Sequence, residues 1–220
     1  MDFSPFYLSF KLAFISTLIL LVFCVPLAYF LSRVSFKGKS VIEAIISLPL
    51  VLPPSVLGFY ILVFLSPYST IGSFFEEHFG IRLVFNFTGL VIASCIYSLP
   101  FMFAPLLGAF NSLPKNIIEA SYTLGKGRIT TMLKIALPNI KPSLLNAIII
   151  SFAHTLGEFG VVLIIGGSLS RETKVASIAI YEATEMLDFT TAHIYSGIML
   201  AISFFVLFCV YFLTKKMKKD

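Results

Sequence analysis

Long runs of apolar residues constrain the fold of this chain more than any other feature of its sequence. A helix that crosses a lipid bilayer needs about 20 predominantly apolar residues. Runs of this kind cover residues 12–31, 41–65, 87–110, 144–165 and 191–213. The chain is 58% hydrophobic and 12% charged, with a mean hydropathy of +0.96, which is far more apolar than a soluble domain requires. We therefore predict an all-α polytopic membrane protein in which residues 1–220 form one domain with five transmembrane helices.

The basic residues gather on one side of these predicted spans. Of the 16 Lys and Arg residues, 12 lie in the first loop, in residues 115–141 or at the C-terminus. The other side holds Lys11, Arg82, Arg171 and Lys174. Because cytoplasmic loops are enriched in Lys and Arg, we predict an external N-terminus and a cytoplasmic C-terminus. The basic residues punctuate apolar runs rather than form a stripe, so a lipid bilayer and no nucleic acid is the predicted environment.

Residues 111–142 form the longest polar segment and show a helix-turn-helix pattern. Good helix formers fill residues 117–124. Asn116 is a candidate cap with Glu119 three residues later, and Ser112 is the alternative cap. Gly125 and Gly127 then favour the left-handed conformation that ends a helix. We predict a short helix followed by a glycine turn.

A second amphipathic run, residues 129–137, is predicted to stop at Pro138. The whole stretch resembles the cytoplasmic signature of ABC importer permeases, which is Glu-Ala-Ala, three residues, Gly, nine residues, Ile, one residue and Leu-Pro. The fixed positions are met by Glu119, Ala120, Gly125, Ile135, Leu137 and Pro138, while Ser121 replaces the second alanine.

The resemblance implies that the first short helix docks into a groove of a separate ATPase subunit. Small residues there allow two backbones to approach, and Glu119 supplies a charge-assisted contact. ATP and Mg²⁺ then belong to the partner, and this chain is predicted to be no enzyme and to bind no cofactor. The triplet Gly38, Lys39 and Ser40 ends like a phosphate loop, but Arg33 stands where such a loop needs its first glycine.

The second apolar run is interrupted by Pro49, Pro53 and Pro54, which are followed by Ser55. Proline frees backbone carbonyls, and such breaks persist in membranes where they are buried in protein or line a water-filled path. We predict that this segment lines the translocation path. The alternative is a kink that only packs against another helix.

The fourth run places His154, Thr155 and Glu158 near the middle of the membrane. An ionisable residue there costs about 2 to 3 kcal/mol, so it faces the bundle interior or a cavity. Glu158 is predicted either to line the path, held by His154, Thr155 or a neighbouring subunit, or to pin two helices together. His78 and His193 lie in other segments, and no spacing of the histidines or of Cys24, Cys95 and Cys209 predicts a metal site.

Three further stretches resemble the permease subunit of molybdate ABC transporters: residues 48–54, residues 155–160 and residues 179–183. That resemblance implies a homodimer of permeases in a bacterial cell (inner) membrane, two cytoplasmic ABC ATPase subunits and an external oxyanion-binding protein. Tungstate and sulfate or thiosulfate are the alternative substrates. A gradient-driven carrier, or an intramembrane enzyme using Glu158 with His154, are more distant alternatives.

The loop at residues 169–188 also carries a helical pattern. Val175, Ile178, Ala179 and Met186 recur at near-helical spacing. We predict a short amphipathic helix lying flat on the external surface, where it either docks a substrate-binding protein or only connects two spans.

Overall fold

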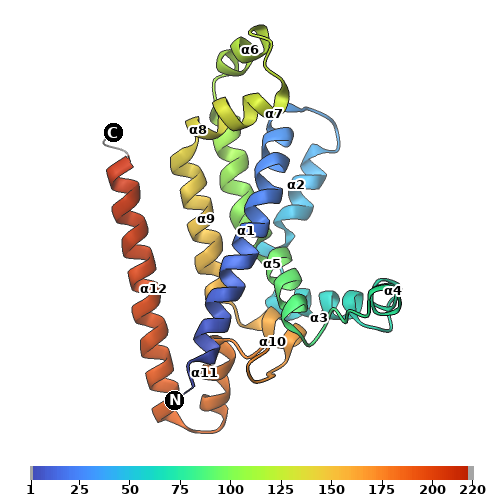
Figure 1. The fold of residues 1–220 in the computed structure, drawn as a ribbon, viewed down its shortest axis with the longest axis vertical. Helices are drawn as coiled ribbons and strands as arrows, with labels where there is room; N and C mark the ends of the chain where they lie inside the picture. Colours follow the sequence, from blue (N-terminus) through green and yellow to red (C-terminus); the bar gives the residue numbers. More distant parts are fainter. Residues whose placement is uncertain (1, 218–220) are drawn as a thin grey trace.

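The computed structural model describes residues 2–217, apart from the side chains of residues 209, 210 and 213–217. Helices form all the regular structure of these residues, which contain no strand, so the predicted all-α class is confirmed. Helices α1 (Ser4–Arg33), α5 (Phe87–Ser112) and α9 (Lys141–Leu156) pack together as the centre of the bundle. Helix α12 (Phe189–Met217) runs beside α9 (Figure 1).

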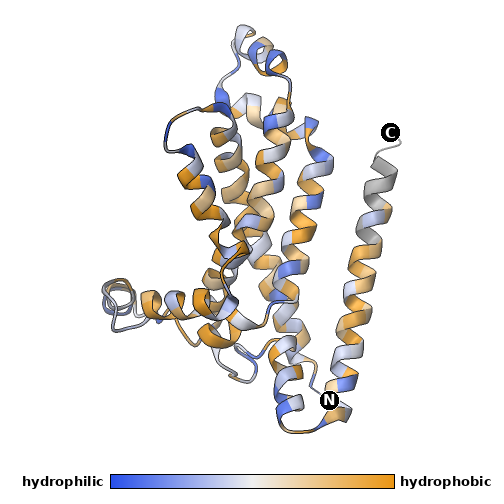
Figure 2. Cartoon of the chain, turned by 180° about the vertical axis from the view of Figure 1, so that it is seen from behind, coloured by the Kyte–Doolittle hydropathy of each residue, from blue (hydrophilic) through white to orange (hydrophobic). Residues whose placement is uncertain are grey.

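The buried face of α1 follows from its sequence spacing. Leu12, Ser16, Leu20, Cys24 and Ala28 recur every fourth residue and are all buried. Residues four apart lie on one face of a helix, and small side chains let membrane helices approach closely. Hydrophobic residues predominate along the middle of the long helices, whereas hydrophilic residues concentrate toward the two ends of the bundle (Figure 2).

The second predicted span is not one straight helix. It divides into α2 (Lys39–Ser47), a 3₁₀ turn at Leu48–Leu50 and α3 (Pro54–Leu65). The chain bends by 110° between the segments Lys39–Leu50 and Pro54–Leu65. Proline removes a helical hydrogen bond and is accepted in a first helical turn, so the cluster both ends α2 and begins α3.

The fourth predicted span, residues 144–165, is not one continuous helix either. Helix α9 ends at Leu156, residues 157–159 are not helical, and α10 (Gly160–Gly166) begins afterwards. Gly157 lies at the C-cap of α9, where its N–H donates to the Ala153 carbonyl. Three helices of the described chain are long and apolar enough to cross a membrane. There are up to five spans if two bent pairs each count as one, namely Lys39–Leu50 with Pro54–Leu65 and Arg128–Asn139 with Lys141–Leu156.

The two remaining connections are helical too. Helix α4 (Thr70–Phe79) projects sideways from the bundle (Figure 1). Helix α11 (Ala176–Glu185) confirms the helix predicted between residues 169 and 188. It does not lie flat on the surface, because its apolar residues Ala176, Ile178 and Ala179 are buried against the rest of the bundle. The predicted C-terminal basic cluster includes Lys218 and Lys219, which lie outside the described residues.

Candidate functional site: the coupling segment and the helix breaks

The coupling segment, residues 111–142, forms one end of the molecule (Figure 1). Helix α6 (Lys115–Thr123) ends in a Schellman motif in which Gly125 N–H donates to the Tyr122 carbonyl and Lys126 N–H donates to the Ser121 carbonyl. Gly125 has a φ of +72°, so the predicted left-handed glycine is confirmed. Gly127 instead has a φ of −71° and is extended.

The predicted start of this helix is wrong. Pro114 occupies the N-cap position without a side-chain cap, and Asn116 lies inside α6. The Ser112 hydroxyl donates to the Ala109 carbonyl at 2.8 Å, at the end of the preceding helix. Proline suits this boundary because its ring fixes φ. The first N–H groups of α6 belong to the exposed residues Lys115 and Asn116, where water takes the place of a side-chain cap.

Within α6 the signature residues differ in their exposure. Glu119 and Ala120 are exposed and available for contact. Ser121 is buried, and its hydroxyl lies 2.9 Å from that of Thr131 in α7 (Arg128–Thr131). A serine at this signature position therefore ties the two arms of the hairpin together, which alanine cannot do.

The second arm continues past the predicted stop. A π-helical segment, Met132–Ala136, is followed by α8 (Leu137–Asn139), so the helix ends at Asn139 rather than at Pro138. Leu137 N–H donates to the Met132 carbonyl, five residues back. The Pro138 ring would press on the carbonyl four residues before it, and a π turn moves that carbonyl away. Pro138 is exposed, while Ile135 and Leu137 are half-buried.

The two helix breaks meet in space. Helix α3 packs on α10, and a Cβ added at Gly160 would lie 2.7 Å from Cβ of Pro54. Gly58 makes a similarly close approach to Val161 and Ile164. Of the predicted path residues, Pro49 is buried, whereas Pro53, Pro54 and Ser55 are exposed. The structure thus joins the proline cluster to the break that follows α9.

Glu158 lies in this second break, between α9 and α10. Its side chain is 5% exposed, and neither carboxylate oxygen has a hydrogen-bond partner among the described residues. The hydroxyl of Ser94 on α5 faces it without meeting hydrogen-bond geometry. The backbone carbonyl of Glu158 accepts a 2.6 Å hydrogen bond from Ser177 of α11.

His154 does not hold Glu158, so that pairing was wrong. Its Nδ1 lies 3.0 Å from the Ser98 hydroxyl, which is also 2.8 Å from the Thr155 hydroxyl. Its ring stacks on Phe101 with centroids 3.7 Å apart. The helix ends at Leu156, before Glu158, so the four-residue spacing does not place the two side chains on one helical face. Ser94 and Ser98 carried no signal in the sequence, because serines inside an apolar run look like ordinary small packing residues.

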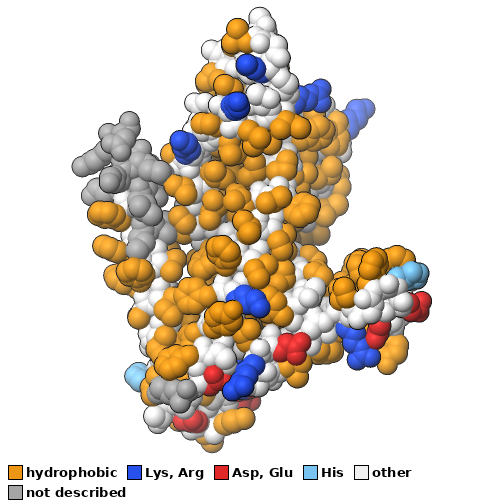
Figure 3. Space-filling view, in the orientation of Figure 1, with side chains coloured by type: hydrophobic (Ala, Val, Ile, Leu, Met, Phe, Trp, Pro, Cys, Tyr) orange, Lys and Arg blue, Asp and Glu red, His pale blue; other side chains and the backbone are white. Residues whose placement is uncertain are grey.

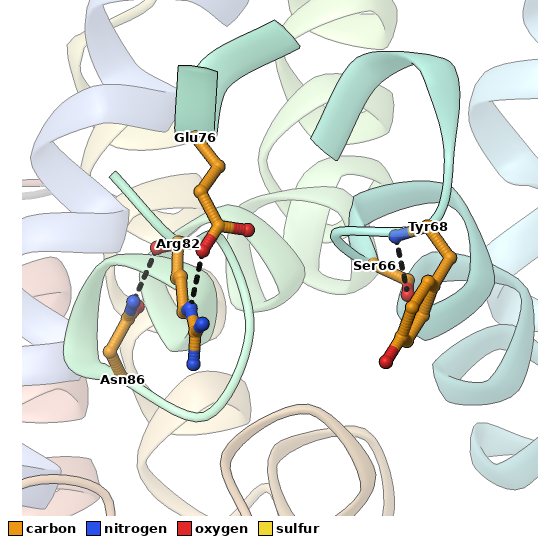
Figure 4. A network of polar contacts seen from close by, with 5 residues as sticks. All are labelled: Ser66, Tyr68, Glu76, Arg82 and Asn86. Carbon is orange, nitrogen blue, oxygen red and sulfur yellow. Dashed lines mark hydrogen bonds and ion pairs between the residues drawn. The ribbon is translucent and has the colours of Figure 1, made fainter. Parts of the chain in front are cut away.

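A cavity of about 790 Å³ lies elsewhere, beside the loops that flank α4. It is lined by residues including Tyr68, Arg82 and Asn86 (Figure 4). Arg82 Nε donates to Glu76 at 2.7 Å, and this hydrogen bond and charge raise the pKa of Arg82 above its usual value. Because its charge is already matched, Arg82 does not mark this cavity as a site for an anion. Among residues 2–217, no three His, Cys, Asp or Glu side chains gather as a metal site requires.

Gly160→Ala tests the contact between the breaks. The added methyl group would meet the rigid ring of Pro54, and overpacking of this kind costs about 1 to 3 kcal/mol. We expect a lower thermal midpoint for the Gly160→Ala variant. Gly157→Ala is the control, because its Cβ would find only ordinary contacts, the nearest at 3.7 Å. Equal behaviour of the two variants would show that the breaks do not depend on this contact.

Membrane-length helices, an exposed hairpin at one end and paired helix breaks define a membrane transport component. Residues 24–219 match the family described as "Binding-protein-dependent transport system inner membrane component". The chain belongs to this family, and it is the permease component of an ABC importer rather than an enzyme.

The chain is also similar to particular permeases and to a solved transporter structure. The chain is 41% identical to the "Molybdenum transport system permease protein ModB" of Azotobacter vinelandii, covering 96% of this chain and 93% of that protein. It is 30% identical to the "Sulfate transport system permease protein CysT" of Escherichia coli strain K12, covering 90% and 71%. A crystal structure of a bacterial alginate ABC transporter in complex with alginate pentasaccharide-bound periplasmic protein has the same fold. It matches with a TM-score of 0.79 and 18% identity, covering 99% of this chain and 79% of that one.

Proposed function

We propose that this chain is a single permease domain that moves molybdate into the cytoplasm, driven by ATP hydrolysis on a separate ATPase subunit. The higher identity to a molybdenum permease than to a sulfate permease carries the choice of anion. Tungstate and sulfate or thiosulfate are the alternative substrates. ATP and Mg²⁺ bind the partner, and this chain supplies the exposed coupling segment with Glu119 and Ala120.

We also propose the assembly and its orientation. Two copies of the chain, two ATPase subunits and one external oxyanion-binding protein form the transporter, because a path at a two-fold interface suits so small a chain. The coupling segment faces the cytoplasm, in keeping with the excess of Lys and Arg on its side of the spans. The helix breaks at Pro54 and Glu158 lie along the path, where interrupted helices are tolerated in a membrane.

Reconstitution with defined sides tests this proposal. The permease and ATPase are placed in vesicles with ATP on the side of the coupling segment and a loaded binding protein on the opposite side. We expect uptake of molybdate, and ATPase activity stimulated several-fold by the molybdate-loaded binding protein. Uptake without the ATPase would favour a gradient-driven carrier. Equal stimulation by sulfate would assign the chain to the sulfate group, and stimulation from the wrong side would reverse the orientation.

A further inference from the structure

A cavity of about 300 Å³ lies where α1 meets the coupling segment. Its polar lining comes from Tyr29 and Arg33 at the end of α1, and from Tyr122 and Arg128 in the hairpin. Its apolar lining comes from residues that include Pro26, Phe30, Ile129 and Met132. The cavity therefore has cationic and hydroxyl groups beside an apolar wall.

The chain anchors the Arg33 guanidinium at this cavity, whereas Arg128 is exposed. Arg33 Nη2 donates to the Phe110 carbonyl at 2.9 Å, and its guanidinium lies over the Tyr29 ring at 5.6 Å. The Nε–H of Arg33 is buried and has no acceptor among the described residues. In the described part of the chain, neither Arg33 nor Arg128 forms a salt bridge. Two positive charges thus line one cavity, and some guanidinium N–H groups there have no acceptor among the described residues.

The cavity opens toward a surface suited to lipid. Phe23, Leu27 and Phe30 lie on one face of α1 and are 68%, 37% and 53% exposed. These residues belong to the first apolar run, and Arg33 follows where that run ends. In Figure 3, Lys and Arg side chains appear around the end of the molecule that carries α6 and α7, above a broad hydrophobic surface. A ligand here meets positive charge at its head and apolar side chains along its tail.

We propose that this cavity binds the phosphate headgroup of an anionic phospholipid, whose acyl chain lies along Phe30, Leu27 and Phe23. Guanidinium groups bind phosphate oxygens through charge-assisted hydrogen bonds, and they do so with better geometry than ammonium groups. The two tyrosine hydroxyls, 3.3 Å apart, share one hydrogen bond, which leaves one O–H to donate at the same place. The lipid bridges α1 to the coupling segment and so stabilises the position from which α6 meets its partner.

Lipid binding to the purified assembled transporter in detergent tests the proposal. Phosphatidylglycerol, phosphatidylcholine and inorganic phosphate are added separately, and bound lipid is counted by native mass spectrometry alongside thermal stability. We expect the wild type to retain phosphatidylglycerol in preference to phosphatidylcholine. Arg33→Gln combined with Arg128→Gln is expected to weaken phosphatidylglycerol binding about tenfold or more, because hydrogen bonds to charged groups are the strong ones.

The controls separate the possible occupants. Lys141→Gln removes an exposed positive charge at the same end that does not line the cavity, and it is expected to bind lipid as the wild type does. Arg128→Gln alone keeps the Arg33 contact with Phe110, so it serves if the double variant does not fold. Unchanged phosphatidylglycerol binding in the arginine variants would overturn the proposal, as would equal protection by inorganic phosphate. The lipid proposal rests on the proposed position of the membrane boundary. Counting bound lipid requires neither the oxyanion nor ATP turnover. A negative result for lipid binding would therefore leave the proposed transport function standing.

Discussion

Replacing Gly125 with valine is expected to detach the ATPase subunit from an otherwise inserted permease. Gly125 has a φ of +72° at the end of α6, where its N–H and that of Lys126 close the helix. A residue with a Cβ pays about 1 to 2 kcal/mol in this left-handed region, and a β-branched residue is disfavoured further. The strain is relieved by rearranging the turn, which moves α6 away from its docking position. We expect ATPase copurification and transport to fall about tenfold or more, since about 1.4 kcal/mol is tenfold in an equilibrium constant.

Gly127→Val is the matched control for this result. Gly127 lies two residues further along the same turn, but it has a φ of −71° and a ψ of 164°, which valine adopts readily. A Cβ at either glycine would meet no other atom within 4 Å, so steric contact within the chain does not distinguish them. Copurification measured side by side therefore reports on backbone conformation. Wild-type transport by Gly125→Val would mean that this segment does not couple the permease to its ATPase.

Periodicity and turn chemistry predicted the parts of the fold that depend on local sequence. The apolar runs at residues 12–31, 87–110 and 191–213 lie within α1, α5 and α12. Gly125 was predicted because a left-handed glycine ends a helix whatever surrounds it. These features are encoded over a few residues, so no knowledge of packing was needed.

The contacts that assemble the helix breaks were not predictable in this way. Gly157 and Gly160 stand within the apolar run at residues 144–165, but isolated glycines are tolerated inside helices. Their presence therefore did not predict that one helix ends at Leu156 and another begins at Gly160. The close approach of Gly160 to Pro54 joins positions more than 100 residues apart. Similarly, α11 was predicted to lie on a surface because an amphipathic face fits a membrane surface or a protein surface equally well. Tertiary packing decides between these outcomes.

Burial of the Glu158 carboxylate is energetically unfavourable, and no hydrogen bond from the described residues compensates for it. A polar group taken out of water without a hydrogen bond costs free energy, and both of its oxygens are without a partner in this conformation. A residue of this kind that serves only to hold helices together would be better replaced by an uncharged one. We therefore expect Glu158 to take its partner from water or from a neighbouring subunit.

Glu158→Gln is therefore expected to separate stability from transport. The amide keeps the shape of the side chain but cannot ionise, so the thermal midpoint of this conformation should stay the same or rise. A change of about 2 kcal/mol in the free-energy difference between two conformations of the transporter alters the ratio of their populations by up to about thirtyfold. We expect the uptake rate to fall about tenfold, within that range, with an altered basal ATPase activity.

Ser151→Ala supplies the comparison. It removes a buried hydroxyl on α9 that, like the Glu158 carboxylate, has no hydrogen-bond partner in the described chain. This variant should transport like the wild type, which would show that loss of a buried polar group is not by itself enough. Measurements of uptake, basal ATPase activity and thermal midpoint on both variants distinguish the two roles of Glu158. If Glu158→Gln leaves uptake and ATPase activity unaltered, the carboxylate only packs between helices, and the path must follow other residues.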